Sequence, residues 1–209
     1  MNNKLPNIME YILDCNSDIV FLAETWLQTD KNLITAEIKT YGYALLHNRR
    51  KDRQKDRGGG VGILVKSNVS TKQLKVKAFV SFEHTIVQIH LCNRKLLFVI
   101  SVYRLQEVAA ATFFDEFTEL LDSYALSNEF FIIAGDTNIH MDTETNVANQ
   151  MKDLLDSYNL MQHIDCATHN KGLTLDVVIT PGKVNVQDVC VTNIDLSQHF
   201  SVLFFCSKL

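Results

Sequence analysis

Apolar residues in the first half of the chain pass from a helical to a strand-like spacing. Near the N-terminus they recur at the spacing of one helix face, which predicts an amphipathic helix from Leu5 to Cys15. Short runs rich in β-branched residues follow, bounded by polar or glycine-containing segments, and these predict buried strands. The runs are DIVFLAE (18–24), VGILV (61–65), TIVQIHL (85–91) and KLLFVISVY (95–103).

In the second half, helical and strand-like patterns alternate. A face of phenylalanines and leucines predicts a helix over residues 112–125 with Thr112 as its N-cap, and a second helix fits residues 147–159. Strands are predicted at FFIIA (130–134), LTLDVVIT (173–180) and FSVLFFC (200–206). Runs such as FFIIA lack polar alternation, which indicates sheets that are covered on both faces. The pattern therefore favours a layered α/β sandwich in which hairpins contribute antiparallel pairs.

Length and composition favour one soluble domain over residues 1–209. With 46% hydrophobic residues the chain can bury a large core, and no repeat, low-complexity tract or linker divides it. Its longest apolar runs fall short of the roughly 20 residues of a membrane span, and the N-terminus lacks the pattern of a secretory signal. We therefore expect an intracellular protein without a membrane partner. Five scattered cysteines without a CxxC pair indicate buried thiols rather than disulfides or zinc ligands.

A local basic segment contrasts with the formal net charge of −4. Residues 49–57, RRKDRQKDR, hold six Lys or Arg against two Asp and precede three glycines. Such a segment is either a solvated loop between strands or a loop that grips phosphate, and the charge pattern leaves both open. Nucleic-acid contact by an acidic chain needs a patch of this kind, so Arg49, Arg50 and Arg57 are candidate phosphate contacts.

Asp136 and Asn138 follow the apolar run FFIIA in the stretch IIAGDTNIHMD. Gly135 would free the backbone for a sharp exit from the strand, which places both residues at the strand's C-terminal end. If the chain stays extended there, positions i and i+2 face the same side and can converge on one ligand. The alternative is an ordinary Asp/Asn turn that caps the next segment.

Other polar residues also collect where predicted strands begin or end. Glu24 and Tyr103 each close an apolar run, and His199 precedes FSVLFFC. Ligand sites of α/β folds are assembled at such ends, although a single Glu there is often only solvated and a single His is often structural.

Asp176 lies inside the apolar run LTLDVVIT, where an unpaired carboxylate is costly. His199 is a candidate partner, because a contact with Asp would fix the tautomer of the imidazole and raise its pKa. The alternative is that Asp176 bonds only to backbone amides or faces water.

Together these residue types suit metal-assisted hydrolysis of a phosphate ester. Glu24 would hold a hard divalent cation such as Mg²⁺, which takes one or two protein carboxylates besides water and phosphate. Asp136 would activate the attacking water with Asn138 orienting it, while His199 and Tyr103 would stabilise charge on the phosphoryl oxygens. The chain has neither a G-x-x-x-x-G-K-[ST] nor a G-x-G-x-x-G motif, which argues against binding of nucleoside triphosphates or dinucleotides.

Six motifs, in order, give the chain a family resemblance from about Asp18 to its end. They are LAETWL (22–27), RGGGVGILV (57–65), SVYR (101–104), GDTNIHMD (135–142), THNKGLTLDVVIT (168–180) and LSQHFSV (196–202). The chain resembles the endonuclease/exonuclease/phosphatase superfamily and, more narrowly, the apurinic-type endonuclease domain of non-LTR retrotransposons. RGGGV together with THNKGLTLD points to the retroelement branch.

The resemblance implies a four-layered α/β sandwich, with two mixed β-sheets packed face to face and helices outside. It implies a Mg²⁺ requirement, with Mn²⁺ as a substitute, and nicking of one strand of DNA that is gripped mainly through its phosphate backbone. A nuclear location and a neighbouring reverse transcriptase domain are implied as well. The implied site residues are Glu24 on the metal, Asp136 with Asn138 at the nucleophile, Tyr103 facing phosphate, a His199–Asp176 pair, and Arg104 as a further phosphate contact.

Three departures from the family pattern bear on activity. The usual S-D-H triplet reads Ser197-Gln198-His199, so a neutral amide replaces an acidic residue and Gln198 can be only a weak metal ligand. The family's first strand, with its active-site Asn, has no counterpart, and Y-R-P reads Tyr103-Arg104-Leu105. Two alternatives therefore stand beside a DNA nickase. One is an impaired or inactive retroelement fragment that binds nucleic acid weakly, and the other is a phosphatase for small phosphorylated molecules.

Overall fold

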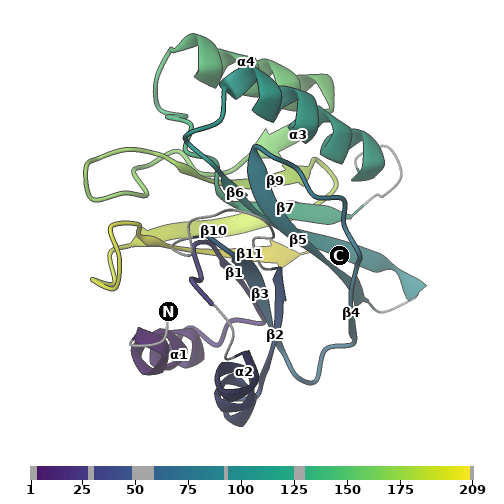
Figure 1. The fold of residues 1–209 in the computed structure, drawn as a ribbon, viewed down its shortest axis with the longest axis vertical. Coiled ribbons are helices and arrows are strands. Elements are labelled where there is room, and N and C mark those ends of the chain that lie inside the picture. The colour runs from purple at the N-terminus through teal and green to yellow at the C-terminus, as the bar shows by residue number, and fades with distance from the viewer. Residues whose placement is uncertain (1–3, 28–30, 49–58, 92–93, 125–129, 208–209) are drawn as a thin grey trace.

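The computed structural model describes residues 4–27, 31–48, 59–91, 94–124 and 130–207 of the chain. Two β layers pack face to face, and a pair of helices covers the outer face of each (Figure 1). The helices are α1 (Leu5–Asp14), α2 (Lys31–Thr40), α3 (Ala110–Tyr124) and α4 (Asn146–Ser157). This arrangement confirms the predicted four-layered α/β sandwich.

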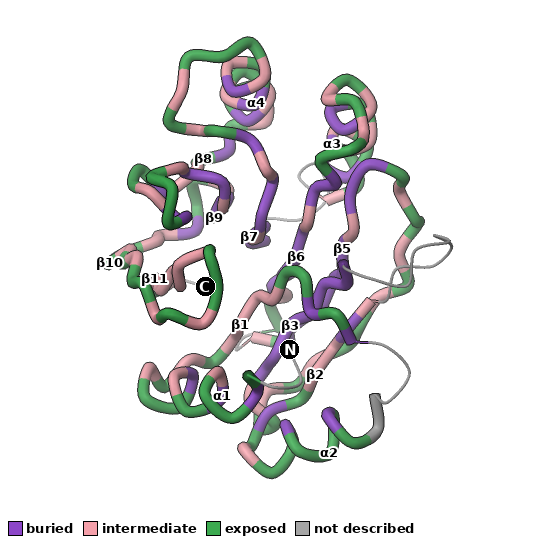
Figure 2. The backbone as a smooth tube through the Cα atoms, turned by 60° about the vertical axis from the view of Figure 1, so that its left-hand side comes forward, coloured by how far each residue is buried: buried purple, intermediate pink, exposed green. Residues whose placement is uncertain are grey.

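The first β layer is one continuous mixed sheet of six strands. In spatial order the strands are β4 (Thr71–Gln73), β5 (Phe82–His90), β6 (Leu96–Arg104), β7 (Phe131–Asp136), β9 (Asp176–Pro181) and β8 (Leu160–Gln162). β6 and β7 are parallel, and every other neighbouring pair is antiparallel. Most residues of β6 and β7 are buried because the sheet has α3 and α4 on one face and the second layer on the other (Figure 2).

The second β layer differs from the prediction because it consists of two antiparallel pieces rather than one mixed sheet. One piece has the order β1 (Ile19–Leu22), β3 (Val61–Lys66), β2 (Tyr43–Asn48), and the other is the pair β10 (Asn185–Thr192) and β11 (Ser201–Ser207). Within the part of the chain that the structure describes, β1 pairs only with β3 and β11 pairs only with β10.

Three hydrophobic clusters hold the layers together. One fills the space between the β layers and includes Ile63 of β3, Val99 of β6 and Ile132 of β7. Another lies under α3 and α4, and a third lies under α1 and α2. Strands with long β-branched runs therefore form the centre of the sandwich, as their sequence pattern predicted.

Several local predictions need correction. The elements α2, β2, β4, β8 and β10 were not predicted, and α3 begins at Ala110, so Thr112 lies inside its first turn and is not the N-cap. The expected burial of the thiols is wrong for four of the five cysteines: Cys166 and Cys190 are exposed, and Cys15 and Cys206 are half-buried. Cys92 lies outside the described residues. None of the described helices has the length and apolar character needed to cross a membrane.

Candidate active site

The register of the six-stranded sheet places three of the predicted site residues in one row. Asp136, the last residue of β7, pairs with Tyr103 of β6 on one side and with Asp176, the first residue of β9, on the other. Directly paired residues on neighbouring strands lie close enough for their side chains to interact. Strand pairing therefore brings together carboxylates that are 40 residues apart in sequence.

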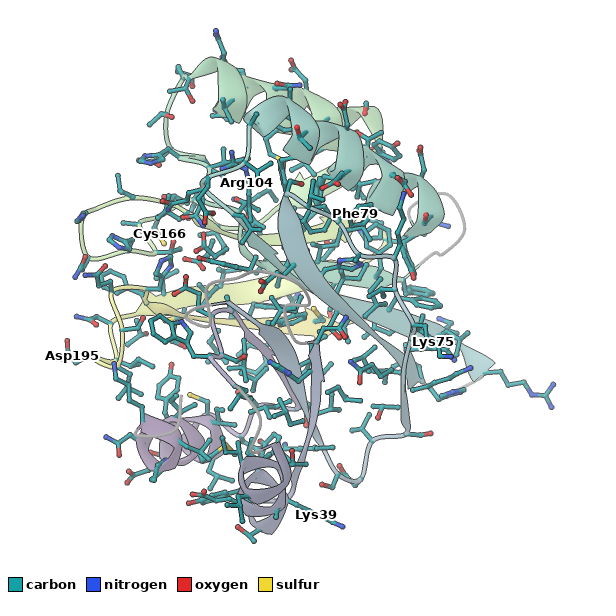
Figure 3. The ribbon with its side chains drawn as sticks, viewed as in Figure 1. Lys39, Lys75, Phe79, Arg104, Cys166 and Asp195 are labelled. Atoms are coloured by element: carbon teal, nitrogen blue, oxygen red, sulfur yellow. The ribbon has the colours of Figure 1, made fainter. Side chains whose placement is uncertain are left out.

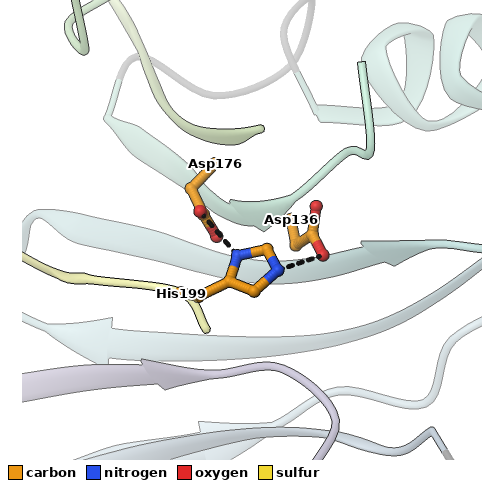
Figure 4. Close-up of side chains that lie close together, drawn as sticks. All are labelled: Asp136, Asp176 and His199. Carbon is orange, nitrogen blue, oxygen red and sulfur yellow. Dashed lines mark hydrogen bonds and ion pairs between the residues drawn. The ribbon is translucent and has the colours of Figure 1, made fainter. Parts of the chain in front are cut away.

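His199 reaches this row from the segment before β11. Its backbone forms an isolated antiparallel bridge with His169, and the N–H of Phe200 donates to the carbonyl oxygen of Thr168 at 2.7 Å. The imidazole lies between the two carboxylates (Figure 4), with Nδ1 at 2.9 Å and Nε2 at 3.7 Å from them. The nearer partner is Oδ2 of Asp176 and the farther one is Oδ2 of Asp136, so the contact expected between Asp176 and His199 is present.

Asp136 has an environment that keeps its proton affinity high. The residue is 5% exposed, and burial, followed by the charges of Asp176 and Glu24, raises its pKa to about 7. His199 and the N–H of Asn138 act in the opposite direction. A carboxylate with a pKa in this range can accept a proton at neutral pH, which is the requirement for a general base.

The pKa of His199 is raised, which favours the positively charged imidazole. Its hydrogen bond to Asp176 is the largest cause of a raised pKa, burial opposes that shift, and the charges of Asp136 and Glu24 add to it. The position of Asp176 is in turn fixed by Thr168, whose Oγ1 accepts from the N–H groups of Leu175 and Asp176 at 3.1 Å each. The imidazole is thus held by a carboxylate that is itself anchored to the backbone.

Glu24 and Tyr103 connect the second β layer to this site. The Tyr103 hydroxyl donates to the Glu24 carboxylate, and the Glu24 charge raises the pKa values of both Asp136 and His199. Glu24 is exposed and lies two residues beyond β1, in a left-handed backbone conformation with φ of 49°. Its carboxylate therefore faces solvent at the edge of the Asp136–His199 pair.

Asn138 follows the turn alternative for GDTN and not the extended one. Its backbone N–H donates to Asp136 Oδ1 at 2.8 Å with φ of 49°, which is an Asx turn. Its side chain is held by β6 and the residues after it: Nδ2 donates to the Arg104 carbonyl at 2.9 Å, and Oδ1 accepts from Nε2 of Gln106. Asn138 therefore ties the Asp136 turn to the end of β6.

Gly135 has a different role from the one its sequence position predicted. It lies within β7 rather than at a sharp exit, with φ of 144°. An added Cβ would lie 2.0 Å from the backbone oxygen of Val102 in β6. Glycine is required here because β6 and β7 approach each other closely beside Asp136.

The remaining predicted contacts are placed less directly. Gln198 is exposed beside His199, and its backbone carbonyl oxygen accepts from the N–H of Asn170 at 2.9 Å. Arg49, Arg50 and Arg57 lie outside the described residues.

Arg104 lies beneath α3 (Figure 3) and is 8% exposed. Its guanidinium carbon is 5.3 Å from the ring centroid of Phe113 in α3. Its Nη1 donates to the Asn138 carbonyl oxygen at 3.3 Å. Burial under α3 thus replaces its expected exposed contact with phosphate, and this side chain supports the Asn138 turn instead.

The site residues fit a hard divalent cation. Asp136, Asp176 and His199 offer ligand atoms that all lie within 4.8 Å of one another, and the Glu24 carboxylate is in electrostatic reach. His199 already bonds to Asp176 and Asp136 is buried, so the exposed Glu24 carboxylate is the ligand best able to turn toward an ion. Carboxylate oxygens are the donors that Mg²⁺ and Mn²⁺ prefer.

Three supporting residues were missed by the sequence reading. Gln106 holds the Asn138 amide, Thr168 holds the backbone at Asp176, and the buried His169 ring lies edge-on to His199 with ring centroids 5.0 Å apart. Thr168 and His169 lie in the stretch THNKGLTLD, where two polar residues shortly before a buried strand were the available signal. For Gln106, the available signal in the sequence was only its position shortly after Tyr103.

Three solved structures illustrate the similarity of the fold. The endonuclease domain of TRAS1, a telomere-specific non-LTR retrotransposon, superposes with a TM-score of 0.73 at 11% identity and covers 95% of this chain and 90% of its own. The human Nocturnin catalytic domain with bound sulfate gives 0.71 at 14% identity, covering 99% and 87%. D. rerio TDP2 with a single-strand DNA product gives 0.63 at 13%, covering 98% and 91%.

The sequence of the chain matches a family model but no curated protein sequence. A sequence model of the Endonuclease/Exonuclease/phosphatase family matches residues 2–199, which include all the site residues brought together above. The fold, the paired carboxylates and the family match agree, and the chain belongs to the Endonuclease/Exonuclease/phosphatase family.

Proposed function

We propose that this protein hydrolyses phosphodiester bonds in DNA, nicking one strand with the help of Mg²⁺ or Mn²⁺. The observation that carries the proposal is the His199 ring placed between Asp176 and the buried Asp136. Such an arrangement supplies a proton acceptor and a positive group side by side, which is what attack of water on a phosphate diester requires.

The roles follow from the environment of each residue. Asp136, with its pKa of about 7, would take the proton of the attacking water as the water oxygen bonds to phosphorus and the P–O bond to the leaving oxygen breaks. His199, kept positive by Asp176, would stabilise charge on the phosphoryl oxygens, and the Tyr103 hydroxyl would donate to the same group. Asn138 would keep the Asp136 turn in place.

The cation would be held by Glu24, with Gln198 as a weak neutral ligand in place of a carboxylate. When bound, a divalent ion supplies positive charge at the phosphate, which the net charge of −4 of this chain does not offer. Because the Gln198 amide is neutral where a carboxylate is expected, less negative charge is available to hold that ion. A high cation concentration would therefore be needed.

DNA is the substrate class that the comparisons support best. The TRAS1 domain is an endonuclease of a retrotransposon, and the TDP2 structure contains a single-strand DNA product. By analogy we assign Arg49, Arg50 and Arg57 to contacts with the phosphate backbone. We also assign residues 1–209 to a single domain of a retroelement that encodes a reverse transcriptase as well, and we expect this domain to act in the nucleus.

A second candidate, an impaired domain that binds nucleic acid without cutting it, is favoured by two observations. Gln198 is neutral where an acidic residue is expected. Among the described residues, β1 and β11 also each pair on one side only, so the layer that carries Glu24 and leads into His199 is less firmly held.

Nicking of supercoiled plasmid in the presence of Mg²⁺ or Mn²⁺ tests the proposal. We expect relaxed circles to form with the intact chain, and Asp136→Ala to slow their formation by about 10²- to 10⁴-fold. Asp153→Ala, an exposed carboxylate on α4, is the matched control and should cut at the original rate. Binding without cutting would favour the impaired domain, and phosphate release from sugar or inositol phosphates would favour a phosphatase.

A further inference from the structure

Trp26, the only tryptophan of the chain, has an unusual backbone for its size. Its φ is 52°, in the left-handed region that bulky side chains rarely adopt. Of the eight non-glycine residues with positive φ in the described part of the chain, five are Asn or Asp and Trp26 is the only aromatic one. Despite this strain the side chain is 54% exposed, so packing of the indole does not explain the conformation.

The conformation of Trp26 is held by backbone hydrogen bonds to the glycine segment that precedes β3. The N–H groups of Thr25 and Trp26 donate to the carbonyl oxygens of Gly60 and Gly59, both at 3.0 Å. Thr25 is 2% exposed, and its hydroxyl bonds to Nε2 of His47 at 2.7 Å. A Cβ on Gly60 would lie 2.6 Å from that hydroxyl. Strain that the surrounding structure enforces so fully is typical of functional positions.

The residue after Trp26 is the one that packs this segment into the hydrophobic core. Leu27 is 5% exposed and belongs to the cluster under α1 and α2, whereas Trp26 is in none of the three clusters formed by described residues. The segment could therefore anchor itself without an aromatic residue at position 26, and the exposed indole needs another reason.

Trp26 lies next to the reacting groups. It is two residues from Glu24, whose carboxylate accepts from Tyr103, and two residues span at most about 7 Å. An indole at this position can reach a base beside the phosphate that the site would cleave.

We propose that Trp26 is a stacking platform for an unpaired nucleobase next to the scissile phosphate. This inference rests on the proposed action on DNA and specifies it: the preferred substrate has single-stranded or locally opened DNA at the cleavage point. Stacking on an aromatic face accepts any base, so Trp26 provides affinity and position without sequence preference.

Binding of two single-stranded oligonucleotides of equal length tests this. One is oligothymidylate, and the other replaces its central thymines with tetrahydrofuran abasic units, which keeps the phosphates. In EDTA, to prevent cleavage, Trp26 fluorescence should be quenched by the first and less by the second. From typical values for one stacked base, Kd should be roughly fivefold to hundredfold weaker for the abasic strand.

Variants assign the effect to Trp26. By anisotropy of labelled strands, Trp26→Ala should bind both oligonucleotides with the affinity that the intact chain has for the abasic one, and Trp26→Phe should retain most of the difference. Phe205→Ala, which removes a 56% exposed aromatic on β11, is the matched control and should behave like the intact chain. Equal affinity of the intact chain for the two strands, or an unchanged preference in Trp26→Ala, would overturn the proposal.

Plasmid nicking measured in parallel separates this inference from the proposed function. Base-dependent binding without nicking would contradict the hydrolysis of DNA and leave the stacking platform standing. Nicking at full rate by Trp26→Ala, with no base-dependent binding, would do the reverse. Failure to bind either strand would overturn both.

Discussion

The two β layers share one core but differ in how completely their strands are paired. In the six-stranded sheet β6 has partners on both sides and all but two of its nine residues are buried. In the other layer all four residues of β1 are half-buried, and no residue of β11 is fully buried. Figure 2 shows this contrast along the two sides of the sandwich. The central strands of the first layer, which carry Tyr103 and Asp136, are therefore more firmly held than β1 and β11.

The candidate active site draws on both layers, and the division matches its chemistry. Tyr103, Asp136 and Asp176 come from paired strands of the first layer. Glu24 and His199 come from segments that adjoin β1 and β11, each of which has one partner strand in the described part of the chain. Asp136, which would take the proton of water, lies on a strand paired on both sides, while Glu24 and His199, which would meet the cation and the phosphate, lie on connecting segments with more freedom.

The largest effect is expected where the first layer is tightest. Gly135→Ala should lower the free energy of unfolding by more than about 4 kcal/mol, because its Cβ would meet the Val102 oxygen at 2.0 Å in a backbone conformation that alanine disfavours. Urea unfolding followed by circular dichroism measures the change. Gly182→Ala, with no atom within 4 Å of the added Cβ, should cost little. Similar losses in the two variants would mean that β6 and β7 can separate without strain.

Truncating one phenylalanine in each layer compares their packing directly. Phe117→Ala, at a fully buried position of α3 against the first layer, should cost about 3–5 kcal/mol. Phe204→Ala, in the half-buried β11, should cost about half as much, because less apolar surface leaves water there. Both values come from denaturant unfolding. Equal losses would show that the second layer is packed as well as the first.

Asp136→Asn should stabilise the protein at high pH while removing activity. The carboxyl pKa rises from 3.8 to about 7 on folding, so stability from this group is complete below pH about 4 and is lost as pH rises through 7. At pH 8 without divalent ions the neutral amide should therefore gain up to about 4 kcal/mol, and at pH 4 almost nothing. Urea unfolding at both pH values checks this. Asp153→Asn, on the α4 surface, should show no such difference, and a pH-independent gain in Asp136→Asn would contradict the buried carboxylate.

The smallest effect is expected from a change in the less firmly held layer. Gln198→Asp should raise the rate of plasmid nicking about tenfold at low Mg²⁺, equivalent to about 1.4 kcal/mol, because it adds a negative ligand for the cation. Gln198→Asn changes the length of the side chain without its charge and is the matched control. If the rate does not rise in Gln198→Asp, the role assigned to position 198 is wrong.

Much of the fold was accessible from local patterns. Runs such as KLLFVISVY and FFIIA identify strands because buried β-branched residues leave few alternatives. The elements that were missed, such as α2 and β8, are short or weakly patterned and form because a neighbouring strand or core face accepts them. Secondary structure of that kind is decided by tertiary contacts rather than by propensity.

The site was predictable to the extent that its residues conflict with their surroundings. A carboxylate in LTLDVVIT needed a partner, and that requirement led to the Asp176–His199 contact that the structure contains. Gln106 and Thr168 could not be found in this way, because a polar residue in a loop conflicts with nothing. Arg104 was expected to contact phosphate, and its burial beneath α3 was visible only once the helix was packed.

By itself, the sequence determined which segments are buried strands and which residue types could carry out phosphate chemistry, since both depend on composition and local spacing. Only the tertiary structure decided that β6, β7 and β9 pair in the register that joins Tyr103, Asp136 and Asp176, and that β1 and β11 pair on one side only among the described residues. It also decided the pKa of Asp136, because burial and the approach of other carboxylates depend on residues far apart in the chain.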